Sequence, residues 1–264
     1  MCVSVAEIKS EEGFILLKKR NILITNDDGI TSDGIVRLAQ AATKFGEVWV
    51  VAPKHQCSAM SHRITLHEPM DLEKVDFPVE GVHAYATSGT PADCVRFGLL
   101  NVVEGKADVV FSGINYGYNC GSDVQYSATI GAALEAATAG TAAVAFSEGA
   151  SEFHEVTDQY LENMIAETLE EIETESLQYN EIININFPSC PISEYKGILR
   201  NRVMATNAFY IDRYKMEPNG NDKWILTVDA TYHEDAAKGT DFRAVVDGYI
   251  SVGRVQNLHT PQGK

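Results

Sequence analysis

The chain has 264 residues with 37 acidic and 21 basic side chains, a formal net charge of −16, and its length allows one large domain or one domain with an appendage. Binding the phosphates of duplex nucleic acid requires clustered lysine and arginine, and the densest basic run covers only residues 18–20, so a duplex-binding protein is excluded. No apolar run reaches the ~20 residues of a membrane span, and five scattered cysteines without a Cys-x-x-Cys pair favour a reducing, cytoplasmic location over a disulfide framework.

The first residues are expected to precede the fold. Residues 1–19 form an N-terminal extension, in part without fixed structure, whose short apolar core over residues 14–17 cannot serve as a signal peptide. A buried strand is predicted over residues 22–24, and a helix with apolar residues at helical spacing follows over residues 35–42. Residues 48–53 form the next predicted buried strand.

The middle of the chain continues this alternation. Two shorter strands are predicted over residues 63–67 and 82–87, as a paired excursion from the main sheet. Residues 88–93 open a helix, because they offer a hydroxyl cap, a proline in the first turn and an acidic residue soon after. A buried strand is expected over residues 107–111, and it runs into a glycine-rich loop over residues 112–121.

The last elements of the core are a helix of small residues, a strand, a long acidic helix and a strand. We expect them over residues 127–139, 142–146, 160–177 and 182–187. Strands that alternate with helices predict a Rossmann-like core over residues 20–187, an α/β fold built as a three-layer α/β/α sandwich with a mostly parallel sheet.

The remainder of the chain has a different pattern. Residues 188–264 contain strand-like runs, such as residues 224–228 and 245–252, and little helical periodicity. They are expected to form a β-rich C-terminal extension that serves as an oligomerisation arm.

Polar side chains follow three of the predicted strands. Asp27 and Asp28 follow the first strand, Ser58 follows the second, and Asn115 and Asn119 follow the strand before the glycine-rich loop. Functional sites of open α/β sheets lie at the carboxyl ends of the strands. Carboxylate, hydroxyl and amide oxygens suit Mg²⁺ or Mn²⁺ better than zinc.

A phosphate group would need hydrogen-bond donors beside such an ion. Ser127 and Thr129 lie at a predicted helix start, where backbone N–H groups and the helix dipole favour an anion. Each residue also has an ordinary interpretation that stays open here: Asp27 and Asp28 as a solvated turn, and Ser127 and Thr129 as helix caps.

Five segments of the sequence resemble, in order, the motifs of the SurE (stationary-phase survival protein) family of metal-dependent 5′/3′-nucleotidases. Their order and spacing over nearly the whole chain make the resemblance specific. The loop over residues 54–59 departs from the family pattern, which leaves the base preference open. The matching segments are residues 22–30, residues 50–53 followed by Ser58, residues 89–95, residues 112–121 with 126–129, and residues 239–242 with 247–252.

The resemblance implies the ligands of one divalent metal ion, Mg²⁺ or Mn²⁺, and the contacts of a substrate phosphate. It also implies a Rossmann-like core and a C-terminal arm used in homodimers or homotetramers. The implied metal ligands are Asp27, Asp28, Ser58 and Asn115, and the implied phosphate-binding residues are Asn119, Ser127 and Thr129.

The predicted function is hydrolysis of nucleoside 5′- and 3′-monophosphates, with short polyphosphate as a further substrate class. Asp27 and Asp28 are the predicted catalytic residues, and Asp28 is favoured for orienting or deprotonating the attacking water. The alternative is a non-catalytic nucleotide-binding protein or a phospho-receiver domain. A receiver requires an acceptor aspartate at the end of its third core strand, where this sequence has Ser112 and Asn115. A dehydrogenase is disfavoured because the first turn lacks Gly-x-Gly-x-x-Gly.

Overall fold

The computed structural model describes most of the chain. Within the predicted N-terminal extension, only β1 (Ala6–Ile8) and β2 (Ile15–Leu17) are described, and they pair with each other antiparallel. The predicted lack of fixed structure elsewhere in residues 1–19 concerns positions outside the described residues. The described ranges are residues 6–8, 15–17, 20–175 and 177–258.

A nine-stranded sheet forms the centre of the described part of the molecule, in the order β10-β15-β9-β8-β7-β3-β4-β6-β5. Six of its strands run parallel, β5 and β15 are antiparallel to β6 and β9, and β10 is parallel to β15. The parallel strands are apolar runs buried on both faces, as such strands usually are. The strands are β3 (Arg20–Thr25), β4 (Gly46–Pro53), β5 (Leu72–Lys74), β6 (His83–Thr87), β7 (Val109–Tyr116), β8 (Ala142–Glu148), β9 (Glu181–Phe187), β10 (Ile198–Arg202) and β15 (Ile250–Gln256).

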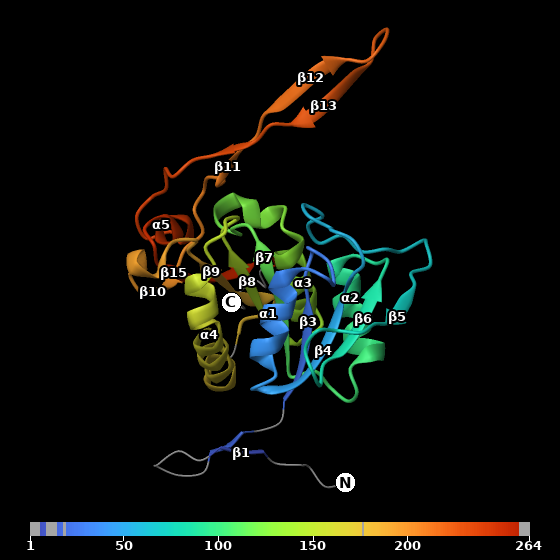
Figure 1. The fold of residues 1–264 in the computed structure, drawn as a ribbon, viewed down its shortest axis with the longest axis vertical. Helices are drawn as coiled ribbons and strands as arrows, with labels where there is room; N and C mark the ends of the chain where they lie inside the picture. Colours follow the sequence, from blue (N-terminus) through green and yellow to red (C-terminus); the bar gives the residue numbers. More distant parts are fainter. Residues whose placement is uncertain (1–5, 9–14, 18–19, 176, 259–264) are drawn as a thin grey trace, which may run out of the picture.

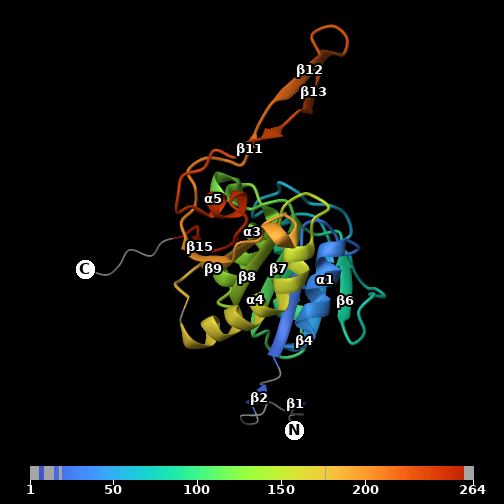
Figure 2. The same ribbon diagram turned by 60° about the vertical axis from the view of Figure 1, so that its left-hand side comes forward.

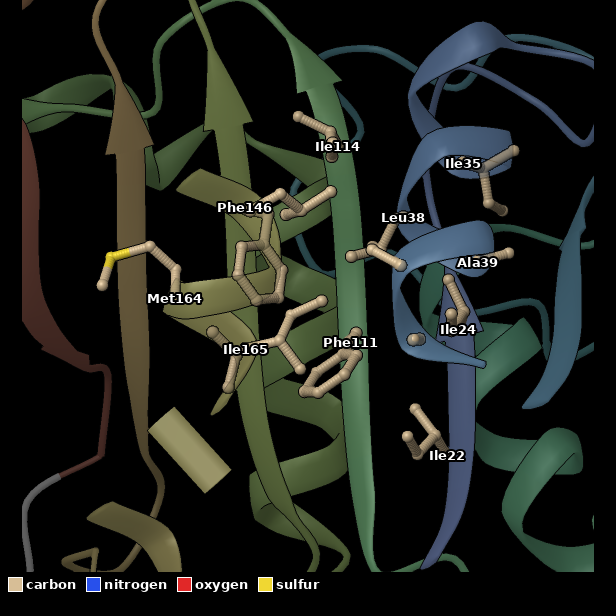
Figure 3. Packing of buried hydrophobic residues seen from close by; sticks show 14 of the residues in the cluster. Ile22, Ile24, Ile35, Leu38, Ala39, Phe111, Ile114, Phe146, Met164 and Ile165 are labelled. Atoms are coloured by element: carbon tan, nitrogen blue, oxygen red, sulfur yellow. The ribbon is translucent and has the colours of Figure 1, made fainter. Parts of the chain in front are cut away.

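Helices cover both faces of the sheet and make three layers (Figure 1). Because neighbouring side chains of a strand point to opposite faces, Ile22 and Ile24 pack into one core cluster and Leu23 into the other. Figure 3 shows the first cluster, in which Phe111 and Phe146 of the sheet pack together with residues of the covering helices such as Leu38 and Ile165. The first face carries α1 (Asp33–Ala42) and α4 (Glu155–Thr174), and the second carries α2 (Pro91–Phe97) and α3 (Ala128–Thr138).

The structure confirms the predicted three-layer α/β/α fold. Three shorter elements complete it: a π-helical turn (Gly98–Val102) after α2 and two 3₁₀ helices (Gly121–Gln125 and Ile192–Glu194). In the part of the chain that the structure describes, no helix is both long and apolar enough to cross a bilayer.

Several predicted boundaries were wrong. Residues 63–67 form no strand, because their backbone pairs with side chains: Thr65 donates to Asp93, and Thr90 donates to the carbonyl of Arg63. The third buried strand does not end at residue 111 but continues as β7 to Tyr116, so the first half of the glycine-rich segment is strand. The acidic helix begins at Glu155, five residues before the prediction.

The C-terminal segment also differs from its prediction in one stretch. Residues 241–246 are helix α5 (Asp241–Val246), and the following strand starts only at Ile250. Thr240 caps α5 by accepting a hydrogen bond from the backbone N–H of Arg243. The helix has only six residues, too few for a helical period to appear in the sequence.

A long hairpin projects away from the sheet (Figures 1 and 2). It consists of β12 (Tyr214–Pro218) and β13 (Trp224–Val228), and β11 (Tyr210–Ile211) pairs with β14 (Thr231–Tyr232) at its base. The strand predicted over residues 224–228 is therefore confirmed. Strands β10 and β15 return to the central sheet, so the segment after residue 187 belongs to the core as well as to an extension.

Candidate active site

A cavity of about 550 Å³ opens at the carboxyl ends of β3, β4 and β7. These strands are adjacent in the sheet, which brings together loops that are far apart in the sequence. Five of the seven residues predicted for the site line the cavity: Asp27, Ser58, Asn115, Asn119 and Ser127. The other two, Asp28 and Thr129, do not line it but contact residues that do.

Asp27 is the most buried carboxylate of the cavity, with 3% of its surface exposed. One carboxylate oxygen accepts a hydrogen bond from the hydroxyl of Thr129 at 2.7 Å. The pKa of Asp27 is raised from 3.8 to about 6, chiefly by burial; the Asp28 charge acts in the same direction, and the hydrogen bond from Thr129 opposes both effects. A carboxylate that is costly to ionise in isolation favours a bound cation.

Asp28 is half-buried and held by two donors. Its Oδ2 accepts from the backbone N–H of Tyr116 at 3.1 Å, and its Oδ1 accepts from Gln56 at 3.4 Å. Gly29 has a φ of +99°, a conformation that glycine adopts readily, so the chain leaves the strand here. Asn26 closes the turn by donating to the carbonyl of Gly29 at 3.0 Å.

Ser58 is exposed on a loop that is anchored on two sides. On one side, the backbone N–H of Cys57 donates to the carbonyl of Asp27 at 2.7 Å. On the other side, the backbone N–H of Ser61 donates to the carbonyl of Tyr126 at 2.9 Å. The loop therefore spans the distance between the aspartates and the start of α3.

The two predicted asparagines are oriented by hydrogen bonds of their amide groups. Asn115 donates through Nδ2 to the carbonyl of Gly117 at 2.8 Å, which fixes which end of its amide carries the oxygen. Asn119 is buried and donates through Nδ2 to the hydroxyl of Ser147 at 2.8 Å.

Two further asparagines on β9 hold the backbone of Asn119, and sequence reasoning did not identify them. The backbone N–H of Asn119 donates to Asn186 Oδ1 at 2.8 Å. Its carbonyl accepts from Asn184 at 2.9 Å and from Asn186 at 3.1 Å. The signal was present in the sequence, since both asparagines alternate with isoleucines in an otherwise apolar strand.

The start of α3 combines a structural role with a place in the cavity. Ser127 is its N-cap, and the hydroxyl oxygen accepts from the backbone N–H of Ile130 at 3.1 Å. Thr129 is fully buried, and its hydroxyl is bonded to Asp27 rather than turned to the cavity. The capping interpretation of Ser127 is confirmed, and the same residue lines the cavity.

The cavity contains many tyrosines and, among the described residues that line it, no lysine, arginine or histidine. The described part of the chain also holds no group of three or more histidine, cysteine or acidic side chains suited to a metal ion. A metal here would therefore need hydroxyl and amide ligands besides carboxylates. The tyrosines of the lining, which sequence reasoning missed, are Tyr116, Tyr118, Tyr126, Tyr210 and Tyr214.

Comparison with known proteins identifies the family of this chain. The family model described as "Survival protein SurE" matches residues 22–208. The chain belongs to the SurE family. It is 41% identical over 233 residues to the 5′-nucleotidase SurE of Thermosipho melanesiensis, covering 88% of this chain and 89% of that protein.

Further SurE proteins agree with this assignment. The chain is 37% identical over 236 residues to the 5′-nucleotidase SurE of Clostridium botulinum (strain Loch Maree / Type A3), covering 88% of this chain and 91% of that protein. The crystal structure of the Sure protein from Aquifex aeolicus matches with a TM-score of 0.73 and 32% identity, covering 89% of this chain and 93% of that chain. The predicted family is thus confirmed, and the relatives are named for a nucleotidase activity that was also predicted here.

Proposed function

We propose that this SurE protein is a divalent-metal-dependent phosphomonoesterase that hydrolyses nucleoside 5′- and 3′-monophosphates to nucleoside and phosphate. The observation that carries this proposal is the buried carboxylate of Asp27 in a cavity whose described lining has no basic side chain. A phosphate would be repelled from such a cavity unless a cation bound with it. The names of the relatives, 5′-nucleotidase SurE, support nucleoside monophosphates as the substrate class.

The oxygen groups of the site fit a hard cation. Asp27 and Asp28 supply carboxylates, Ser58 a hydroxyl and Asn115 an amide oxygen, a set that suits Mg²⁺ or Mn²⁺. The raised pKa of Asp27 fits the same interpretation, because a bound cation would compensate for the burial of its charge. When bound, such an ion polarises a phosphoryl oxygen and lowers the pKa of water.

The chain's own residues then position the phosphate and the water. Asn119 and Ser127 line the cavity next to Asp27, and the N-terminus of α3 directs N–H groups towards an anion. We assign phosphate binding to these two residues and to the backbone of Thr129, whose side chain positions Asp27. Asp28, held by the N–H of Tyr116, orients the attacking water or accepts its proton.

The hairpin of β12 and β13 supports the further proposal of an oligomerisation arm that forms homodimers or homotetramers. All ten residues of its two strands are exposed. They include Met216, Trp224 and Leu226, which expose 61%, 50% and 61% of their surface. Apolar groups gathered on a projecting element indicate a protein interface. Sedimentation of the full chain and of Trp224→Ser tests this role, and an unchanged oligomer size in the variant would contradict it.

The free thiols support a reducing compartment. Cys57, Cys94, Cys120 and Cys190 are all free, as expected for the cytoplasm, which we propose as the location. Retention of the protein in a fraction other than the cytosol after cell fractionation would overturn this assignment.

The test of the function is phosphate release from a panel of 5′- and 3′-nucleoside monophosphates and short polyphosphate, with EDTA, Mg²⁺ and Mn²⁺ in parallel. We expect release that requires metal and is lost in Asn115→Ala. The thermal melting curve of each variant shows whether it remains folded. Nucleotide binding without release by the folded wild type would instead support the alternative, a non-catalytic nucleotide-binding protein.

A further inference from the structure

Three exposed tyrosines line the cavity of the candidate active site. Tyr116, Tyr126 and Tyr214 expose 56%, 63% and 61% of their surface, and all three line the cavity that contains Asp27. Single exposed aromatic residues are common on proteins, but several at one cavity indicate a binding surface. They come from three separate parts of the chain, since Tyr214 begins strand β12 of the projecting hairpin (Figure 1).

These rings form no aromatic pairs within the described part of the chain. In contrast, Tyr118 and Tyr210, which line the same cavity, both pack edge-on against Phe209. More than half of the surface of each of the three tyrosines is therefore available to a ligand.

The lining of the cavity thus combines two chemically different kinds of side chain. Asn115 and Ser127 are polar, and the residue next to each in the sequence, Tyr116 or Tyr126, is aromatic. A nucleoside monophosphate has the same division, with a charged phosphate at one end and a flat base at the other. We propose that Tyr116, Tyr126 and Tyr214 form a stacking subsite for the nucleobase, which prefers purines over pyrimidines; this subsite rests on the function proposed above.

Stacking explains the preference, because the polar groups near these rings do not distinguish the two classes of base. One carboxylate oxygen of Asp123 accepts from the backbone N–H of Phe209 at 2.6 Å. Asp212 is a carboxylate that can accept from the amino groups of adenine, guanine and cytosine alike. Every base has a π-face, and stacking on an aromatic side chain contributes about 1–3 kcal/mol per base. The larger ring system of a purine covers more of the tyrosine faces.

The test compares two substrates that differ only in the base. AMP and ribose 5-phosphate carry the same phosphate ester on the same sugar, and steady-state kinetics of both are measured with Mn²⁺. In Tyr126→Ala we expect the KM for AMP to rise about tenfold relative to that for ribose 5-phosphate, from the size of one stacking contact. Tyr126→Phe keeps the aromatic face and restores the wild-type ratio. Tyr179→Ala removes another exposed tyrosine that does not line the cavity, 52% exposed, and leaves the ratio unchanged.

The same series tests the base preference. Wild type is expected to have a higher kcat/KM for AMP and GMP than for CMP and UMP, and Tyr126→Ala and Tyr214→Ala are expected to reduce this difference. An equal loss for AMP and ribose 5-phosphate, or no loss, overturns the subsite while leaving the phosphatase in place. If wild type hydrolyses neither substrate, the proposed function fails, and calorimetric binding of AMP and ribose 5-phosphate to the same variants decides the subsite by itself.

Discussion

Replacing Asp27 with asparagine is expected to stabilise the metal-free protein while it abolishes phosphatase activity. Burial raises the pKa of Asp27 from 3.8 to about 6, and one pKa unit corresponds to about 1.4 kcal/mol. Holding this group ionised at pH 7.5 therefore costs about 3 kcal/mol of folding free energy. Asparagine has nearly the same shape, still accepts the hydrogen bond from Thr129, and has no charge to bury. For a chain of this length the gain corresponds to a rise in Tm of about 6 °C at most.

The sign of the pH dependence follows from the direction of the shift. The folded protein holds the proton of Asp27 up to about pH 6, whereas the unfolded chain releases it near pH 3.8. The folded state thus binds more protons between these two pH values, so the stability of wild type falls as pH rises through this window. The free energy of unfolding of Asp27→Asn should exceed that of wild type most above pH 6. The difference should fall to about 1 kcal/mol at pH 4.5 and vanish well below pH 3.8.

Urea unfolding followed by circular dichroism, in EDTA at pH 7.5 and pH 4.5, measures this difference. Asp76→Asn is the control: it removes an exposed carboxylate, and its effect should stay within about 0.5 kcal/mol. A variant Asp27→Asn that is no more stable than wild type at pH 7.5 would refute the reasoning from burial. Full metal-dependent activity in the same variant would refute the role of Asp27 in the site.

Three further substitutions test the supports of the site. Thr129→Val removes the donor to Asp27, so the pKa of Asp27 in the metal-free protein should rise further and the fall in stability with pH, measured by urea unfolding in EDTA, should extend to higher pH; an unchanged pH dependence would speak against this coupling. Asn186→Ala removes two hydrogen bonds to the backbone of Asn119 and should lower kcat/KM at least about tenfold, the effect of ~1.4 kcal/mol at the transition state; wild-type kinetics would contradict a positioning role. Thr90→Ala removes the cap of α2 and should cost about 1 kcal/mol in urea unfolding without changing kcat/KM, whereas a change in kcat/KM would show that α2 influences the site.

The central fold could be predicted because the core strands are mostly apolar, buried segments that alternate with helices along the chain. The strand predicted over residues 182–187 is β9, and the helix opened by residues 88–93 has the predicted cap, with Thr90 and Asp93 bonded to each other's backbone. One wrong prediction concerns a segment whose backbone hydrogen-bonds to side chains instead of to a neighbouring strand. Residues 63–67 alternate like a strand, but Thr65 pairs with Asp93 in the folded protein. No local pattern could reveal that partner.

The candidate site was predictable in its position more than in its details. Ends of adjacent parallel strands meet, so the sequence pattern alone could place Asp27 and Asn115 together. The role of Thr129 could not be predicted, because a hydroxyl at a helix start looks the same whether it faces a ligand or a neighbouring carboxylate. The contribution of Tyr214 could not be predicted either, since it depends on the base of the hairpin lying beside the cavity.

Neutral groups, rather than cations, hold the carboxylates of this site. The hydroxyl of Thr129 supports Asp27, and the backbone N–H of Tyr116 supports Asp28. A basic side chain in either place would lower the cost of burying these charges, but it would also compete with a metal ion for them. With neutral supports, the negative charge of Asp27 stays uncompensated within the described cavity, so the cation that enters removes the burial cost and the repulsion of phosphate together. Metal binding, substrate binding and stability are therefore coupled through Asp27, and a substitution there should change all three.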